Sequence, residues 1–469
     1  MLKTLLSISS LLLAVAMLLF GHGLQTALIP LRAGIEGFST IAIGLSISAY
    51  FGGFVIGCLF GPYIIFRAGH IRTYAAMVSL ASAVALLHPL VIDETAWAFF
   101  RFATGFCIAS FYVVIESWLN ERATNEVRGL IMSTYVVITL LGIMAGQFAT
   151  AFGSIDGNTL FIVASIVVSV AVIPIALTTS TQPAPISLVR FRPRQLYATS
   201  PAAFVSSMLI GVSVASTWML APVFATARGF ETSFAAIFAA VMIGGGALAQ
   251  WPIGRLSDKF DRRLVVAVLG IGSAVFCTAL GLAQGNSNWT FLGLVFLVGV
   301  FTHSTYAIAV AHAFDNCDPD NYVETSSGLL LSFGIGSAIG PIIASLLMDS
   351  SDPGALFLFV AIVQVGMVVY LGWRMTANQA VAQPDREDFD WASTAPVIAM
   401  TNEEALDLNT DLLIPDIIAE AQEVEEANAA VQFNDFGYAF DEEMGADPTV
   451  EFLPEEVISE NSSTEVSTN

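Results

Sequence analysis

Apolar stretches of about 20 residues, separated by short polar loops, make up the chain as far as residue 374. Within a bilayer, backbone groups are satisfied only in helices or closed barrels, and a helix of about 20 residues crosses the hydrocarbon layer. The pattern therefore predicts an all-α membrane protein with twelve transmembrane helices. We place them at about 5–29, 40–61, 73–92, 96–117, 130–152, 159–177, 202–225, 233–254, 264–284, 289–312, 326–347 and 355–374.

Lysine and arginine are unevenly distributed among the loops between these stretches. With the N-terminus in the cytoplasm, fourteen of them lie on the cytoplasmic side, only Arg32 and Arg228 lie outside, and Arg101 falls within a helix. Loops rich in Lys and Arg stay in the cytoplasm. We therefore expect a multi-pass protein of the inner (plasma) membrane with both termini cytoplasmic.

The segment 178–200 contains three prolines and three arginines and has no long apolar run. It is expected to be a cytoplasmic central loop that divides the membrane part into an N-terminal half, 1–177, and a C-terminal half, 201–374, each with six helices.

The two halves show signs of an internal repeat. The loop Pro62–Arg72 follows the second apolar stretch, and the loop Gly254–Arg263 follows the eighth, 192 residues further along the chain. Two six-helix repeats place a binding site at their interface, near the middle of the bilayer. Pairs of glycines also correspond, at an offset of 194 residues: Gly142 and Gly146 with Gly336 and Gly340.

The net charge of −22 is confined to the tail, residues 375–469, which holds 23 acidic residues and one basic residue. Such a composition buries too little apolar surface to fold alone, so we expect a largely disordered cytoplasmic tail. An acidic tail also excludes nucleic acid as a partner. Two apolar groups within it, at 406–424 and 433–440, are consistent with docking of a cytoplasmic protein or with a passive, solvated tail.

The chain contains no pattern typical of an enzyme or of a cofactor protein. A phosphate-binding G-x-x-x-x-G-K-[ST] loop and an HExxH motif are both absent. The acidic residues near Asp315 resemble a calcium loop only weakly, because Pro319 interrupts them and the glycine and last ligand are missing. We therefore expect no catalysis, no cofactor and no metal.

The loop after the eighth stretch resembles the G-x-x-x-D-R/K-x-G-R-R/K signature of the major facilitator superfamily, with Asp261 in place of the second glycine. In the first half, Phe66 stands where the acidic residue is expected. The matching residues, which we take as a gating loop, are Gly254, Asp258, Lys259, Arg262 and Arg263, with Arg67 and Gly69 in the first half. The physical chemistry suits this role, because Asp258 can cap the next element and pair with a basic residue across the two halves.

Two further patterns resemble the same superfamily. Arg101 and Gly105 match an intramembrane Arg-x-x-x-Gly pattern, and the run Glu116–Asn120 looks most like the YcaD-type permeases of the superfamily. The resemblance implies two halves that rock about a central site, driven by an ion gradient, most often of protons.

Several polar residues within the apolar stretches are candidates for a substrate or proton pathway. Arg101 is expected to act in proton coupling or anion contact, or else to reach the outer interface as a long side chain can. Glu116 is interpreted as a gate residue that pairs with Arg67, Arg72 or Arg128, the alternatives being a proton site or placement at the interface. The remaining candidates are Gln25 and Trp218, as substrate contacts or helix-packing residues, and His303 with Tyr306. A proton relay is one interpretation of His303, and a hydrogen-bonded histidine of the core is the other.

These observations predict a secondary active transporter of a small molecule, neutral or amphipathic rather than highly charged. The Gly340-Pro341 pair resembles a motif of exporters, so export is slightly favoured over import, although helix packing explains the pair equally well. The alternative is a sensor or scaffold derived from a transporter and acting through its acidic tail.

Overall fold

The computed structural model describes residues 8–122, 128–177, 196–197, 199–285, 287–317 and 322–377. The acidic tail beyond residue 377 and most of the central loop lie outside the described residues, so the expectations for both stay predictions. The helices are α2 Ser9–Ile35, α3 Thr40–Ala68, α4 His70–Leu90, α5 Glu94–Arg122, α6 Arg128–Thr150, α7 Thr159–Val170, α8 Ile173–Ala176, α10 Pro201–Ala227, α11 Thr232–Lys259, α12 Arg262–Leu282, α13 Asn288–His303, α14 Thr305–Phe314, α15 Tyr322–Ser350 and α16 Ala355–Ala377.

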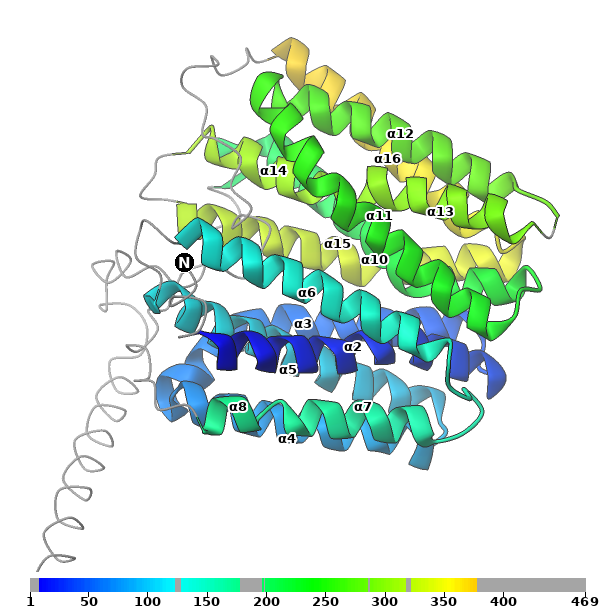
Figure 1. Ribbon diagram of the computed structural model, residues 1–469. Helices are drawn as coiled ribbons and strands as arrows, with labels where there is room; N and C mark the ends of the chain where they lie inside the picture. Colours follow the sequence, from blue (N-terminus) through cyan, green and yellow to red (C-terminus); the bar gives the residue numbers. More distant parts are fainter. Residues whose placement is uncertain are drawn as a thin grey trace, which may run out of the picture. The chain divides into compact units, whose positions relative to one another are not determined.

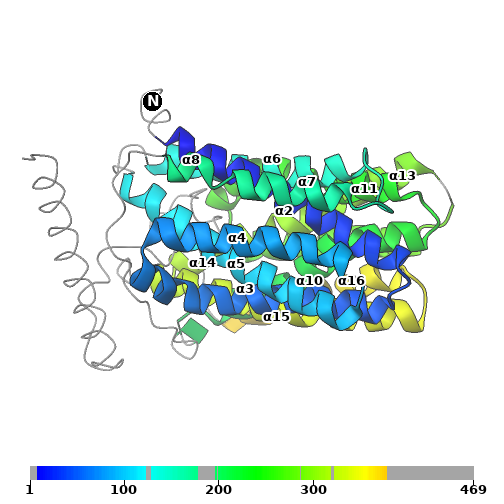
Figure 2. The same ribbon diagram turned by 90° about the horizontal axis from the view of Figure 1, so that it is seen from below.

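Among the described residues, twelve spans are long and apolar enough to cross a membrane, which confirms the predicted number. The helices lie side by side in one bundle, with α2 to α8 in the lower part of Figure 1 and most of α10 to α16 in the upper part. Seen from below, α2 to α8 lie nearest to the viewer (Figure 2).

The packing of the first six spans is repeated in the last six. In the first half α2 packs on α6 and α3 packs on α5, and in the second half α10 packs on α15 and α11 on α13. The two halves meet where α3 contacts α15, α6 contacts α11 and α2 contacts α10. The pairs α3–α15 and α11–α6 occupy equivalent places in the repeat.

Glycines at helix crossings repeat with an offset of 192 or 194 residues. A Cβ added to Gly53 of α3 would overlap the carbonyl oxygen of Phe102 in α5, and 192 residues later Gly245 of α11 lies in the same way against Phe296 of α13. Small residues are needed where two helix backbones approach this closely. The correspondence extends to Gly105 against Tyr50 and Gly299 against Met242, and to Gly146 against Phe20 and Gly340 against Val212.

Two of the twelve spans are interrupted. The sixth span breaks between α7 and α8, where Pro174 lies in the first turn of α8 and lacks the N–H that would continue the helix. The tenth span breaks at Ser304, between α13 and α14, without a proline. The Ser304 hydroxyl donates to the carbonyl oxygen of Gly246 in α11, at 3.3 Å. The sequence predicts neither interruption.

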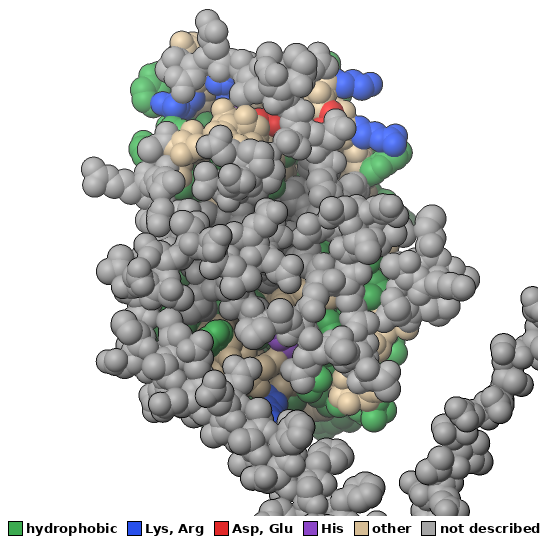
Figure 3. Space-filling view, turned by 90° about the vertical axis from the view of Figure 1, so that its left-hand side faces the viewer, with side chains coloured by type: hydrophobic (Ala, Val, Ile, Leu, Met, Phe, Trp, Pro, Cys, Tyr) green, Lys and Arg blue, Asp and Glu red, His purple; other side chains and the backbone are tan. Residues whose placement is uncertain are grey.

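The two ends of the bundle differ in charge. The end at which α2 begins and α16 finishes carries most of the described basic side chains and is called the basic end; Figure 3 looks onto it. At the opposite end two arginines hold loops in equivalent places of the repeat. Arg32 donates to the carbonyl of Ile155 at 2.8 Å. Arg228 donates to Gly281 at 2.8 Å and to Asp352 at 2.6 Å.

Candidate functional site

Arg101 lies inside the bundle and not at its surface. It is placed about two turns into α5, and only 1% of its surface is exposed. The centre of its guanidinium lies 4.5 Å from the centroid of the Tyr50 ring, and Nη2 points to the sulfur of Met219 at 3.2 Å. Because α3 and α10 enclose the side chain, it does not extend to the outer interface.

Tyr50 links Arg101 to His22. The Tyr50 hydroxyl and His22 Nε2 form a hydrogen bond of 3.1 Å, and the two rings stack with centroids 5.5 Å apart. His22 also packs on Trp218, with ring centroids 6.3 Å apart and the two ring planes at 82°. We call His22, Tyr50, Arg101, Trp218 and Met219 the central polar cluster. It is built from three helices of the first half and one of the second.

The cluster has more hydrogen-bonding capacity than the protein itself satisfies. Four buried polar atoms in and beside it make no hydrogen bond with any described residue: Arg101 Nη1, His22 Nδ1, Trp218 Nε1 and Gln25 Oε1. In the part of the chain that is described, no carboxylate forms a salt bridge with Arg101. Since an unpaired charge within a membrane protein is costly, such residues are usually functional.

His303 and Tyr306 flank the break in the tenth span. Neither ring nitrogen of His303 has a hydrogen-bond partner among the described residues, and the Tyr306 ring packs on Phe333 with centroids 4.8 Å apart. Within that part of the chain, neither residue shares a hydrogen bond or ring contact with the central polar cluster. The five pathway candidates therefore divide into Arg101 and Trp218 in the cluster, Gln25 one turn after His22 on α2, and His303 with Tyr306 at the break.

The first-half loop at the basic end turns at Gly69, which joins α3 directly to α4. Its φ is 80°, a conformation that favours glycine, so this part of the motif has a backbone explanation. Arg67 and Phe66 are exposed.

In the second-half loop the helix cap is Asp261 and not Asp258, contrary to the expectation from the sequence. Asp258 lies in the last turn of α11, whereas the Asp261 carboxylate accepts from the backbone N–H of Arg263 at 2.9 Å and so caps α12. Burial raises the pKa of Asp261, but the hydrogen bonds and charge of Arg263 outweigh burial and lower it overall. The residue that departs from the superfamily pattern thus has a structural role of its own.

The other motif residues lie in the same corner. Gly254 is buried in α11, where its carbonyl accepts from Ser257 at 2.7 Å, and Lys259 at the end of that helix is exposed. Arg262 forms an ion pair with Asp315, with Nε and Oδ2 3.0 Å apart and both side chains almost fully buried, at 1% and 3% exposure. Asp258 forms a longer ion pair with the same arginine, with 3.9 Å between Asp258 Oδ1 and Arg262 Nη2.

Glu116 is fully buried in α5 and accepts a hydrogen bond of 2.9 Å from the hydroxyl of Tyr135 in α6. Of its predicted basic partners, Arg67 and Arg72 are exposed, and the side chain of Arg128 lies outside the described residues. The gate role of Glu116 therefore stays a prediction.

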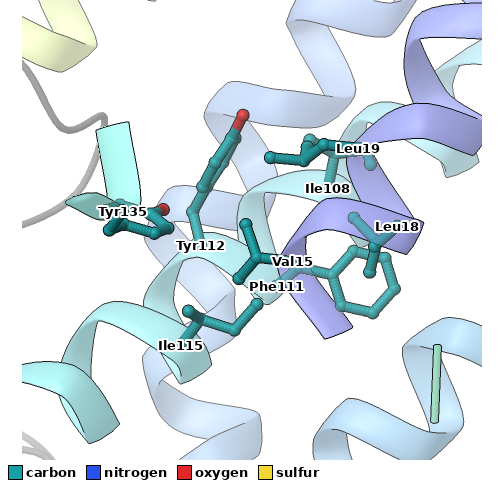
Figure 4. A pocket seen from close by; sticks show the side chains of 8 residues that line it. All are labelled: Val15, Leu18, Leu19, Ile108, Phe111, Tyr112, Ile115 and Tyr135. Carbon is teal, nitrogen blue, oxygen red and sulfur yellow. The ribbon is translucent and has the colours of Figure 1, made fainter. Parts of the chain in front are cut away.

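A small pocket next to Tyr135 lies within the first half, between α2, α5 and α6 (Figure 4). Its lining is apolar apart from two tyrosines, and all of it comes from one half. It therefore lacks the polar groups and the two-sided construction of the central polar cluster. Figure 4 shows the lining residues: Val15, Leu18, Leu19, Ile108, Phe111, Tyr112, Ile115 and Tyr135.

Each half of the bundle matches a known family model. The family model described as "Major Facilitator Superfamily" matches residues 203–404, and the model described as "Sugar (and other) transporter" matches residues 10–183. The chain belongs to the major facilitator superfamily. It is a multi-pass membrane transporter, and members of this superfamily are not enzymes.

Superfamily relatives match over most of the bundle. The chain is 28% identical over 352 residues to a protein of Salmonella arizonae described as an uncharacterized MFS-type transporter, YcaD, covering 71% of this chain and 87% of the relative. The YcaD protein of Escherichia fergusonii is 28% identical over 342 residues, with the same coverage. The predicted likeness to YcaD-type permeases is thereby confirmed.

Solved structures of other transporters share the fold. A point mutant of the nucleoside transporter NupG gives a TM-score of 0.68 at 14% identity, covering 79% of this chain and 99% of that one. A bacterial homologue of the human lysosomal transporter Spinster, inward-facing and occupied, also gives 0.68, at 13% identity, covering 81% and 97%. These comparisons do not favour the sensor alternative.

Sequence reasoning missed Tyr50, Met219, Tyr135 and Asp315 as partners of its candidates. Of these, Tyr50 could most easily have been identified from the sequence, because it is a polar aromatic residue in an apolar stretch, shortly before the glycine pair Gly52-Gly53. Met219 offers no such feature, since methionine is common in apolar helices.

Proposed function

We propose that this transporter carries a small molecule by secondary active transport, and that the molecule binds at the central polar cluster. The observation that supports this most directly is the set of buried, unsatisfied polar atoms on side chains from both halves. Ligand pockets typically combine apolar and aromatic walls with a few convergent polar groups.

The position of the cluster between the two halves supports alternating access as the mode of transport. Arg101 contacts Met219 and His22 faces Trp218, so both contacts join the first half to the second. When the halves rock apart, these contacts separate and the polar atoms become accessible. The contacts of α3 with α15 and of α6 with α11 form the surfaces about which such a movement occurs.

We further propose coupling to protons. A chain with few intramembrane charges has few places to carry a proton, and His303 is one of them. Its imidazole lies beside the break in the tenth span, with neither nitrogen hydrogen-bonded to the described residues. Interrupted helices at mid-membrane depth commonly mark binding sites in transporters. Tyr306, one turn further along, completes this candidate relay.

The orientation proposal places the basic end in the cytoplasm of a cell whose plasma membrane holds the protein. Exposed basic residues at that end include Arg67, Arg72, Arg255 and Lys259, whereas Arg32 and Arg228 lie at the other end. The bias follows the positive-inside rule. In this orientation Gly254, Asp258 and the rest of the gating loop latch the cytoplasmic side of the bundle.

Export stays a weak preference over import. Gly340 packs against the carbonyl oxygen of Val212, so helix packing accounts for the glycine that suggested export. The acidic tail remains a proposed docking segment for a cytoplasmic protein. Deletion of residues 378–469 separates these roles, because a transporter keeps moving solute without its tail whereas a scaffold does not.

The test of the function compares small-molecule pools inside and outside cells that lack the protein with those of overproducing cells. Arg101→Ala should abolish the movement of the responding solute, whereas Arg255→Ala, an exposed arginine stacked on Trp251 at 4.0 Å, should retain it. Outward movement establishes an exporter and inward movement an importer. A solute that moves equally with the Arg101→Ala variant contradicts the placement of the site.

A further inference from the structure

We infer that the central polar cluster selects an organic monoanion, a carboxylate attached to an apolar body, over a neutral or cationic molecule of the same shape. This inference rests on the proposed function, because it concerns the ligand of the same site.

The first argument is the balance of charge. Arg101 contributes one positive charge, and no carboxylate in the described part of the chain pairs with it. Its contacts are a tyrosine face and a thioether sulfur, which stabilise a cation without neutralising it. An entering monoanion neutralises the site, whereas an amine adds a second positive charge to it. A dianion leaves one negative charge uncompensated.

The second argument is the balance of donors and acceptors. The guanidinium Nη1 and the indole Nε1 of Trp218 can only donate, and both lack partners among the described residues. Trp218 directly precedes Met219, the residue that contacts Arg101, so the two donors lie in the same part of the cluster. Two buried donors without partners suit the two oxygens of a carboxylate, whose hydrogen bonds with charged donors are stronger than neutral ones.

The third argument is the apolar surround. The ring of Tyr50 contacts both the guanidinium and the His22 ring, and Phe51 packs against it with centroids 5.1 Å apart. Trp218 supplies a further aromatic wall. An anion with an apolar or aromatic body can therefore place its charge on Arg101 and its body against these rings.

The experiment uses the purified full-length protein and three probes of the same shape: 3-phenylpropionate, 3-phenylpropanamide and 3-phenylpropylamine. Binding is measured at pH 7 from the rise in melting temperature with probe concentration. We expect the carboxylate to bind at least about tenfold tighter than the amide, as the loss of a charge-assisted hydrogen bond implies, and the amine to bind more weakly still.

Arg101→Gln should remove the preference for the carboxylate over the amide. Arg101→Lys keeps the positive charge but loses the planar set of guanidinium donors, so it should prefer the carboxylate over the amide less strongly than the parent protein does. Because this variant still binds, it also shows that loss of binding in Arg101→Gln is not merely a failure to fold. Arg255→Gln is the matched control, because it removes an exposed guanidinium that stacks on Trp251 outside the central polar cluster. It should bind the carboxylate as the parent protein does.

Equal or tighter binding of the amide or the amine overturns the inference, as does a preference that survives in Arg101→Gln, or no binding of any of the three. If the amide or amine binds and Trp218→Phe weakens it, the site stands and only the ligand class is wrong. If the carboxylate binds through Arg101 but vesicles containing the protein do not move it, the inference stands and the transport proposal fails for that solute.

Discussion

Gly53 of α3 lies directly against the carbonyl oxygen of Phe102 in α5, so close that no Cβ fits between the two helices. Phe102 is the neighbour of Arg101, and Tyr50 lies one turn before Gly53. This contact therefore fixes the distance between α3, which carries Tyr50, and α5, which carries Arg101.

Gly53→Ala should force these helices apart, because a new methyl group would overlap backbone and not a movable side chain. We expect a loss of about 1–3 kcal/mol in stability, typical of overpacking, together with a larger loss of transport. Gly52→Ala is the matched control, since the nearest atom to its Cβ would be a ring carbon of Phe102 at 3.9 Å. Thermal melting and transport by both variants check this, and equal behaviour of the two would contradict it.

The Tyr50 hydroxyl and the Tyr50 ring have separable roles. Tyr50→Phe loses the hydrogen bond to His22, for an expected cost of about 1 kcal/mol, but keeps the aromatic face beneath Arg101. Tyr50→Leu loses both and should abolish transport. The comparison is made by melting temperature and solute movement at matched expression. If the two variants lose transport equally, the cation–π contact has no part in function.

Rocking of the halves can be arrested by a disulfide between α3 and α15. A Cβ built on Gly334 would lie 3.9 Å from the Cβ of Val55, within the range that disulfides occupy. In a protein with Cys58→Ser, the pair Val55→Cys and Gly334→Cys should crosslink on oxidation and stop transport, and reductant should restore it. Each single cysteine variant should transport under both conditions. Undiminished transport by the crosslinked pair would rule out separation of α3 from α15 during the cycle.

Asp261 should stabilise the second-half loop in a pH-dependent way. Its pKa is lowered in the folded protein, so its contribution is present at neutral pH and is lost as the pH falls through that lowered pKa. Asp261→Ala should cost about 1 kcal/mol at pH 7, as loss of a helix cap does, and the difference from the parent protein should narrow at acid pH. Asp261→Asn keeps a good cap without the charge, so melting curves of the two variants separate capping from the ion pair with Arg263. A difference that widens on acidification would contradict the lowered pKa.

Proton coupling through His303 predicts a change in the pH dependence of transport. In vesicles that contain the purified protein, an imposed pH gradient should drive the solute in the parent protein and fail to do so in His303→Gln, while exchange of solute at equal pH continues. His312→Gln serves as a control, because His312 lies at the basic end, within 3.3 Å of Asn316. A His303→Gln variant that still responds to the gradient would exclude His303 from the relay.

The membrane architecture can be read from the amino-acid sequence because the bilayer acts on local properties of the chain. A run of about 20 apolar residues must be a helix wherever it crosses, so the twelve spans follow from composition alone. The repeat is visible for a similar reason, because close helix crossings require small residues, and Gly142 and Gly146 recur as Gly336 and Gly340.

Which polar residues meet depends on the folding of the whole bundle. Arg101 and Met219 are 118 residues apart, and nothing local to either residue specifies the other. Their contact depends on how α3, α5 and α10 pack, and therefore on backbone approaches such as that of Gly53 to Phe102. The same holds for the break at Ser304, whose hydroxyl donates to the carbonyl of Gly246, 58 residues away in the sequence. Hydropathy is a sum over neighbours in sequence, whereas a binding site is made of neighbours in space, and packing is what brings those together.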